Sequence, residues 1–231
     1  MAKRVLVVAA HPDDEVLGAG GAIAWHRKQG DRVTVLILGE GVTARSANRG
    51  AASRSGHAPA LRRLRQEMAR AHRLLGVHMA VHRQFPDNRF DGVELLELVK
   101  AVEAIMRTVK PHLIYTHHQG DLNIDHRRTC EAVLAAARPL PGSTIERVLA
   151  FEVLSSTEWS LPRRGFAPTV YLSIAPFLSR KLKAMRCYRS ELRPFPHPRS
   201  LRAIEAQARW RGSACGVEAA EAFVLLRERI L

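Results

Sequence analysis

Short apolar runs alternate along the chain with longer segments whose apolar residues recur at helical spacing. The runs are rich in Val, Ile and Leu and predict strands at residues 4–10, 32–38, 77–83, 112–116, 147–154 and 169–174. Helical spacing, with Gly or Pro near several ends, predicts helices at residues 16–29, 61–75, 94–109, 127–137 and 201–211. This alternation is typical of parallel sheets, so we expect an α/β fold with a largely parallel sheet flanked by helices.

Two segments interrupt the alternation and predict loops, at residues 41–60 and 159–168. The first is rich in Gly, Ala, Ser and Arg and directly follows a predicted strand. A long loop in that position often binds a ligand, but simple disorder explains the same composition almost as well. Both interpretations stay open.

Chain length and cysteine content narrow the class of protein. A length of 231 residues is enough for one compact domain with a substantial core, so we expect a single domain, residues 1–231, in preference to two. No run of eighteen apolar residues occurs, so we expect no membrane span, and the apolar start resembles a first strand more than a signal peptide. The three cysteines (Cys130, Cys187 and Cys215) are odd in number and far apart, which argues against disulfides and favours the cytoplasm.

Charge is the unusual global feature, because 36 Lys plus Arg against 22 Asp plus Glu leave a net charge of +14. The arginines are scattered over predicted helices, which is typical of a solvated surface. No motif of a nucleic-acid-binding fold accompanies them, so we expect no nucleic-acid partner. Attraction of an anionic small substrate stays open.

A dense polar cluster, His11-Pro12-Asp13-Asp14-Glu15, directly follows the first predicted strand. Side chains at the carboxyl end of a strand in an open parallel sheet face the crevice where ligands usually bind. Three neighbouring carboxylates repel one another unless a cation or a shared proton offsets them. Because imidazole nitrogen and carboxylate oxygen together suit zinc, we favour a metal site over a simple helix cap, which needs only one carboxylate.

A second polar cluster spans residues 117–126 and follows another predicted strand. It contains His117, His118, Asp121, Asp125 and His126. An ordinary turn, with Asp125 capping the next helix, explains this segment alone about as well as a functional site does. Two such clusters, each between a strand and a helix, are much harder to explain by turns.

At these two clusters the chain resembles the LmbE-like, PIG-L-type zinc-dependent de-N-acetylases. The first motif of that family, Ala-His-Pro-Asp-Asp-Glu, is matched completely at residues 10–15, and the second, which ends in Asp-His, is matched at Asp125 and His126. Weaker matches occur at residues 86–89, Lys183, residues 188–190 and residues 220–223. The resemblance implies a single Rossmann-like domain that removes an N-acyl group, most simply acetyl, from an amino-sugar conjugate.

Carried over to the matching positions, the resemblance assigns His11, Asp14 and His126 as ligands of zinc, with another divalent ion such as Fe²⁺ as a replacement. It assigns Asp13 as the general base toward the metal-activated water. A carboxylate beside the metal can take that proton and later return it to the leaving amine. We expect Asp125 to orient a neighbouring imidazole, either His126 or another histidine in the crevice.

The chain departs from several relatives at Asn123, where they place a histidine that stabilises the oxyanion. An asparagine amide can donate a hydrogen bond to an oxyanion, so we expect Asn123 to supply it, with His117 and His118 as further candidates. We expect six other histidines, none with a paired ligand nearby in the sequence, to be ordinary surface or packing residues (His26, His57, His72, His78, His82 and His197).

The substrate class follows from the resemblance and is a small N-acetylated sugar conjugate. Its anionic part, if it has one, is expected to contact an arginine, Arg65 or one of Arg45, Arg49 and Arg54, and Asn88 is expected to contact a sugar hydroxyl. Two alternatives remain, a zinc hydrolase of a non-sugar amide or ester and a basic polyanion binder. The sequence also leaves a homo-oligomer open.

Overall fold

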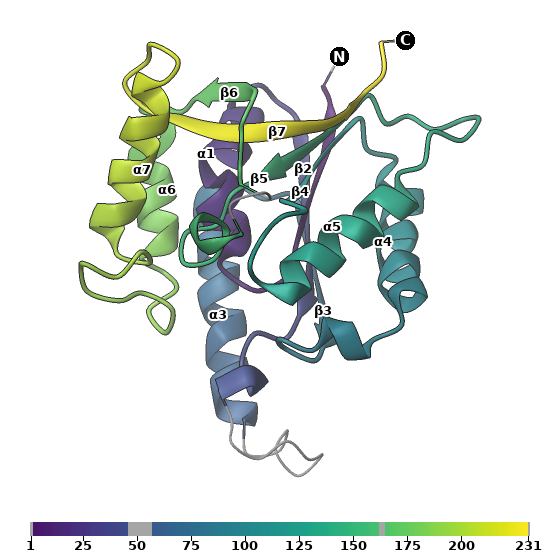
Figure 1. Ribbon diagram of the computed structural model, residues 1–231, viewed down its shortest axis with the longest axis horizontal. Helices are drawn as coiled ribbons and strands as arrows, with labels where there is room; N and C mark the ends of the chain where they lie inside the picture. Colours follow the sequence, from purple (N-terminus) through teal and green to yellow (C-terminus); the bar gives the residue numbers. More distant parts are fainter. Residues whose placement is uncertain (1, 46–56, 162–164, 231) are drawn as a thin grey trace.

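Strands from both ends of the chain lie in one mixed sheet, in the order β3-β2-β1-β4-β5-β7-β6 (Figure 1). The computed structural model describes residues 2–45, 57–161 and 165–230. The strands β3, β2, β1, β4 and β5 are mutually parallel, whereas β7 runs antiparallel to both β5 and β6. Their bounds are β1 Arg4–Ala9, β2 Arg32–Gly39, β3 Met79–Phe85, β4 Leu113–His117, β5 Arg147–Phe151, β6 Val170–Ser173 and β7 Ala220–Glu228.

Helices cover both faces of the sheet and make a three-layer α/β domain (Figure 1). One face carries α1 (Asp14–Lys28), α3 (Ala58–Leu75), α6 (Leu178–Met185) and α7 (Leu201–Ser213). The other carries α4 (Leu95–Val109) and α5 (Ile124–Ala136). Among the described residues, no helix is both long enough and apolar enough to cross a membrane.

The central strand β1 shows why the core has two halves. Its alternate residues Val5, Val7 and Ala9 pack into the core beneath α1 and α3. The residues between them, with Ala10, pack into the core beneath α4 and α5. Both sets are fully buried, because a strand with covered faces must be apolar at every position. The continuous apolar run that predicted this strand therefore reflects its central place in the sheet.

The expected fold class is confirmed, with two additions near the C-terminus. All six predicted strands and all five predicted helices overlap elements of the structure. The sequence analysis did not predict α6 or β7, and β7 enters the sheet between β5 and β6 as an antiparallel strand. Of the two predicted loops, residues 46–56 and 162–164 lie outside the described residues, and α3 begins at Ala58, inside the first predicted loop.

The first helix, α1, is broken near its middle, where Ala19 has the non-helical angles φ −142° and ψ 16°. Lys181 Nζ donates to the freed carbonyl of Leu17 at 2.7 Å. The Glu221 carboxylate accepts the freed N–H groups of Gly21 and the following residue, both at 2.7 Å. Lys181 and Glu221 also form a buried ion pair at 2.6 Å. This pair therefore satisfies the backbone groups that the break leaves without helical partners.

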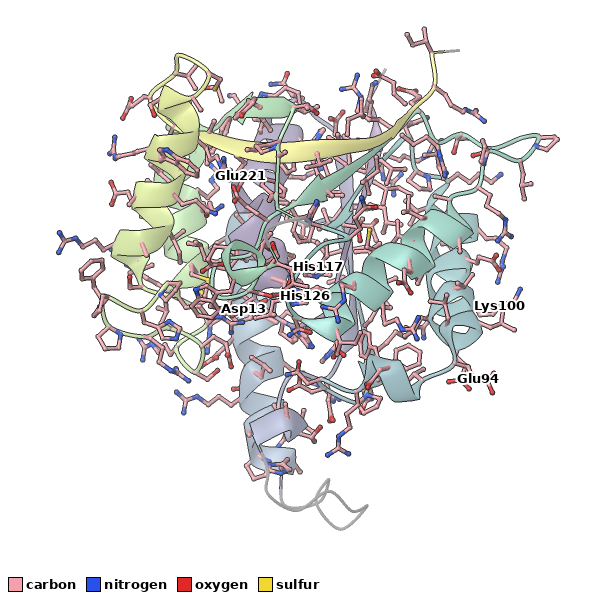
Figure 2. All side chains as sticks on the ribbon, in the orientation of Figure 1. Asp13, Glu94, Lys100, His117, His126 and Glu221 are labelled. Carbon is pink, nitrogen blue, oxygen red and sulfur yellow. The ribbon has the colours of Figure 1, made fainter. Side chains whose placement is uncertain are left out.

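Replacing Lys181 with methionine is expected to lower the free energy of unfolding by about 3–5 kcal/mol, because Glu221 then stays buried without its cation. Chemical denaturation measures this change. The control is Lys100→Met on the outer surface of α4, where Lys100 is mostly exposed and pairs with Glu103 (Figure 2). Loss of that exposed pair should cost less than about 1 kcal/mol. Equal losses in the two variants would contradict the role given to Lys181.

Candidate active site

The candidate site lies at the carboxyl ends of β1 and β4, where the strand order reverses direction. From β1 the chain passes through α1 to β2 on one side, and from β4 it passes through α5 to β5 on the other. Such a switch point leaves a crevice above the strand ends, which is the usual ligand site of open α/β sheets. Gly39 packs closely against the end of β1. A Cβ added to it would come within 2.9 Å of the Ala10 carbonyl oxygen and 3.2 Å of the His11 ring, so this position has little room for a side chain.

The sheet and two helix N-termini bring His11, Asp14 and His126 together. Ligand atoms of all three residues lie within 4.8 Å of one another. Asp14 Oδ2 is 3.3 Å from His11 Nδ1 and 3.2 Å from His126 Nε2. All three side chains are buried. Burial alone would raise the pKa of Asp14, but His126 and His11 hold it well below its usual range, so the carboxylate stays charged.

Unpartnered atoms show that this group suits a divalent cation. Within the described residues, Asp14 Oδ1 has no hydrogen-bond partner, and the 3.2 Å contact of His126 Nε2 with Asp14 Oδ2 does not have the geometry of a hydrogen bond. Buried polar atoms are seldom left without a partner, and two imidazoles with one carboxylate are the donor set of a catalytic zinc site with an open position. The residues therefore fit a zinc ion or a similar divalent metal.

Two other groups of possible ligands overlap this one. They are His117, Asp121 and His126, and His11, Asp87 and Asp125. Their carboxylates already accept several hydrogen bonds, which makes them better supports for the imidazoles than ligands of a second ion.

Asp125 contacts the ring of His11 at its Nε2 atom. Its Oδ2 lies 2.9 Å from His11 Nε2 and accepts the N–H of Asn88 at 2.6 Å, while its Oδ1 accepts the N–H of Phe90 at 2.9 Å. The expected role of Asp125 is to orient an imidazole, and the imidazole it contacts is that of His11. With Nε2 turned to Asp125, His11 presents Nδ1 to the metal group.

Asp121 supports His126 in the same way. Its Oδ1 is 3.2 Å from His126 Nδ1, and its carboxylate accepts hydrogen bonds from the hydroxyls of Ser156 and Thr157. Burial opposes protonation of His126, but Asp14 and Asp121, one on each ring nitrogen, raise its pKa to about 9. Binding of a metal at Nε2 would therefore release a proton.

Asp13 directly precedes Asp14 in the sequence and has an unusual backbone conformation. Its φ is 104°, a left-handed value that costs a non-glycine residue about 1–3 kcal/mol. Its side chain is buried, with Oδ2 3.1 Å from Arg199 Nη1 and Oδ1 without a hydrogen-bond partner among the described residues. Burial raises the pKa of Asp13 well above its usual range, and Arg199 opposes that rise. A carboxyl group with a raised pKa suits proton transfer near neutral pH.

Asn123 caps α5 with the oxygen of its side chain. Asn123 Oδ1 accepts the N–H of Asp125 at 2.8 Å, which fixes the orientation of the side-chain amide. The Nδ2 group is the donor that an oxyanion could use. The expected oxyanion role stays a prediction.

The two histidines at the end of β4 have different surroundings. His117 is fully buried and stacks on His126 with ring centroids 3.9 Å apart. Its Nε2 accepts the N–H of Ala10 at 2.8 Å, which ties β4 to the end of β1. The ring of His118 instead lies edge-on to Phe166 at 5.3 Å. Figure 2 labels His117 and His126, whose rings stack on one another.

The expected substrate contacts differ in how near they lie to this centre. Asn88 follows β3 and is bonded to Asp125, so it adjoins the site. Arg65 is an exposed residue of α3, and Arg45 ends a short 3₁₀ turn, Thr43–Arg45. Arg49 and Arg54 lie outside the described residues. The contacts of these residues with a substrate stay predictions.

Sequence analysis gave no role to Arg199, although this residue contacts Asp13 from 186 residues away. Its guanidinium also donates to Glu191 at 3.2 Å and to the Ser155 hydroxyl at 2.8 Å. No motif surrounds Arg199, so its place in the site could be found only from the folded chain. His72 is expected to be an ordinary packing or surface histidine. It is buried, and its Nε2 lies 3.0 Å from Glu15 Oε1.

Fold and site together define a Rossmann-like α/β protein with a buried His-Asp-His group that fits a divalent metal. Residues 6–137 match the PIG-L family, described as GlcNAc-PI de-N-acetylase, and the chain belongs to that family. The chain is 27% identical to the uncharacterized deacetylase YaiS of Escherichia coli strain K12, over 81% of this chain and 91% of the relative. It is 30% identical to the 1D-myo-inositol 2-acetamido-2-deoxy-alpha-D-glucopyranoside deacetylase of Rhodococcus erythropolis strain PR4, over 73% of this chain and 72% of the relative.

Solved structures share the fold at lower sequence identity. The N,N'-diacetylchitobiose deacetylase from Pyrococcus horikoshii has a TM-score of 0.76 at 22% identity, covering 97% of this chain and 84% of that one. The 4-carboxy-2-hydroxymuconate hydratase from Pseudomonas putida KT2440 has a TM-score of 0.73 at 24% identity, covering 99% and 98%. A deacetylase and a hydratase thus share this fold, which shows that the fold alone does not define the reaction.

Proposed function

We propose that this chain hydrolyses the N-acetyl amide of an amino-sugar conjugate. The observation that carries the proposal is the group of His11, Asp14 and His126 beside the unpartnered Asp13 Oδ1. Membership of the PIG-L family supports the same reaction, as does a relative whose name specifies deacetylation of an acetamido-sugar inositol conjugate.

In this proposal, His11, Asp14 and His126 hold a zinc ion, or another divalent ion such as Fe²⁺. The donor set supports this choice, because two imidazoles and a carboxylate leave one position open for water or substrate. A divalent ion bound there supplies Lewis-acid chemistry, which lowers the pKa of a water and polarises the amide carbonyl. Asp125 keeps His11 Nε2 turned away from the ion and leaves Nδ1 for binding.

Asp13 moves the proton. Oδ1 takes a proton from the attacking water as the water oxygen bonds to the amide carbon, and returns it to the nitrogen as the C–N bond breaks. The products are acetic acid and the free amine, which at neutral pH are acetate and the protonated amine. Arg199 holds Oδ2 during both transfers, so that Oδ1 remains the oxygen that faces the reaction. Asn123 Nδ2 is the proposed donor to the oxyanion.

The function is tested by measuring acetate release from a panel of N-acetylhexosamine conjugates, with and without an anionic substituent. We expect release by the zinc-loaded protein, loss of release on chelation, and recovery when zinc is restored. The panel includes non-sugar amides and esters, which would identify a hydrolase of a different bond. A protein that holds one metal ion but releases no acetate from any sugar conjugate would contradict the proposed substrate class.

A polyanion binder predicts a different result from the same protein. Its binding to DNA or RNA would weaken as salt is raised and would survive both chelation and the substitution Asp13→Asn. A hydrolase needs both the metal group and Asp13.

A further inference from the structure

We propose that Glu15 is a positioning residue that holds the backbone of Asp13 in its left-handed conformation. The inference rests on the proposed function, in which Asp13 is the general base. Glu15 is the third carboxylate of the first cluster and has no part in the metal group. Its side chain is fully buried and does not contact bulk solvent.

The contact between Glu15 and Asp13 is similar to half of a capping box, with the glutamate at the second helical position in place of the third. Asp13 is the N-cap residue of α1, yet its side chain makes no capping hydrogen bond. Glu15 Oε2 instead accepts the backbone N–H of Asp13 at 3.0 Å. In a complete capping box the N-cap side chain would also bond back to the helix. Because that half is missing, the Asp13 carboxylate is left for chemistry while its backbone is still held.

Two further residues fix the other oxygen of Glu15. The Tyr188 hydroxyl donates to Glu15 Oε1 at 2.6 Å, and His72 Nε2 lies 3.0 Å from the same oxygen. Tyr188 follows α6 and His72 lies on α3, so the carboxylate is held by two separate parts of the chain. Both side chains are buried. With both oxygens engaged, Glu15 cannot rotate toward the metal group without losing these bonds.

These contacts hold Asp13 at two points. Glu15 fixes the backbone, and Arg199 fixes Oδ2 of the side chain. A left-handed backbone at a non-glycine residue persists only where its surroundings enforce it. Loss of the Glu15 contact should therefore let the Asp13 backbone relax and move Oδ1, without removing any atom that binds metal or substrate.

The test uses Glu15→Gln and Tyr188→Phe, with Tyr115→Phe as the matched control. Glutamine has one acceptor oxygen in place of two, so it cannot accept from Asp13 and Tyr188 on opposite sides. Tyr115 is also a buried tyrosine with a bonded hydroxyl, 3.1 Å from His26 Nε2, but it lies away from Asp13. The control therefore removes the same atom from a comparable buried site.

We expect Glu15→Gln and Tyr188→Phe to lower kcat by about 10- to 100-fold, the cost of a small misplacement of a reacting group. KM should stay within about twofold and the metal content unchanged, because substrate and metal contacts are kept. Tyr115→Phe should keep the wild-type kcat. The loss in the double variant should be smaller than the product of the two single losses, because Tyr188 and Glu15 hold the same Asp13 backbone.

Amide hydrogen exchange at Asp13 provides a second readout that needs no substrate. Exchange of this N–H should be faster in Glu15→Gln and Tyr188→Phe, and unchanged in Tyr115→Phe. If wild-type protein releases no acetate, the proposed function fails, and the exchange rates alone decide on the positioning role. The inference is overturned if Tyr188→Phe matches Tyr115→Phe in kcat and the Asp13 amide exchanges at the wild-type rate in both Glu15→Gln and Tyr188→Phe.

Discussion

Replacing Asp13 with asparagine is expected to lower kcat for acetate release by about 100- to 10,000-fold, the usual contribution of a positioned general base. Asparagine has nearly the same shape but cannot take a proton from water. Because His11, Asp14 and His126 are untouched, the variant should still hold one metal ion per chain. Acetate release and metal content are measured on the same preparation.

The same substitution should not destabilise the metal-free protein. Burial raises the pKa of Asp13 in the folded chain, so its negative charge opposes folding at pH values above the pKa of the unfolded chain. Neutral asparagine removes that opposition, and the Tm of metal-free Asp13→Asn at neutral pH should equal or exceed that of the wild type. Such a trade between stability and activity is common at functional sites.

Asp31→Asn is the matched control for Asp13→Asn. Asp31 is also a buried aspartate, but it pairs with His26 at 2.7 Å, at the far end of α1 from the metal group. This variant should lose stability and keep its kcat. An Asp13→Asn protein with nearly wild-type kcat would show that another group takes the proton.

Replacing His126 with alanine is expected to abolish both metal binding and acetate release. The change leaves only two proposed ligands, His11 and Asp14. The loss of metal affinity should exceed the roughly 10- to 100-fold loss that follows removal of a residue hydrogen-bonded to a metal ligand. Metal content after dialysis against a weak chelator and the rate of acetate release are the two measurements.

His26→Ala is the control for His126→Ala, because both residues are buried histidines whose Nδ1 faces an aspartate. It should lower the Tm and leave metal content and kcat unchanged. If His126→Ala kept one tightly bound metal ion, the ligand set proposed for this chain would be wrong. The next group to test would be His11, Asp87 and Asp125, which does not include His126.

Much of the fold could be predicted because its elements have local signals. The strand β1 is apolar from Val5 to Ala9, and Gly30 follows shortly after the end of α1 at Lys28. Both signals lie in neighbouring residues of the sequence. The strand β7 (Ala220–Glu228) escaped prediction because its apolar run, residues 222–226, is short, and such a run does not by itself distinguish a strand from a helix. Its place between β5 and β6 depends on pairing with strands about 50 or more residues earlier in the chain.

The sequence by itself determined the chemistry available at this site, and the tertiary structure decided how that chemistry is divided among the residues. The motif at residues 10–15 predicts a metal site because its residue types and its position after a strand are local properties. It does not distinguish the three carboxylates from one another. Asp14 faces His126, Asp13 faces Arg199 and Glu15 faces Tyr188. Those partners lie more than one hundred residues away, and only folding brings them within hydrogen-bond distance.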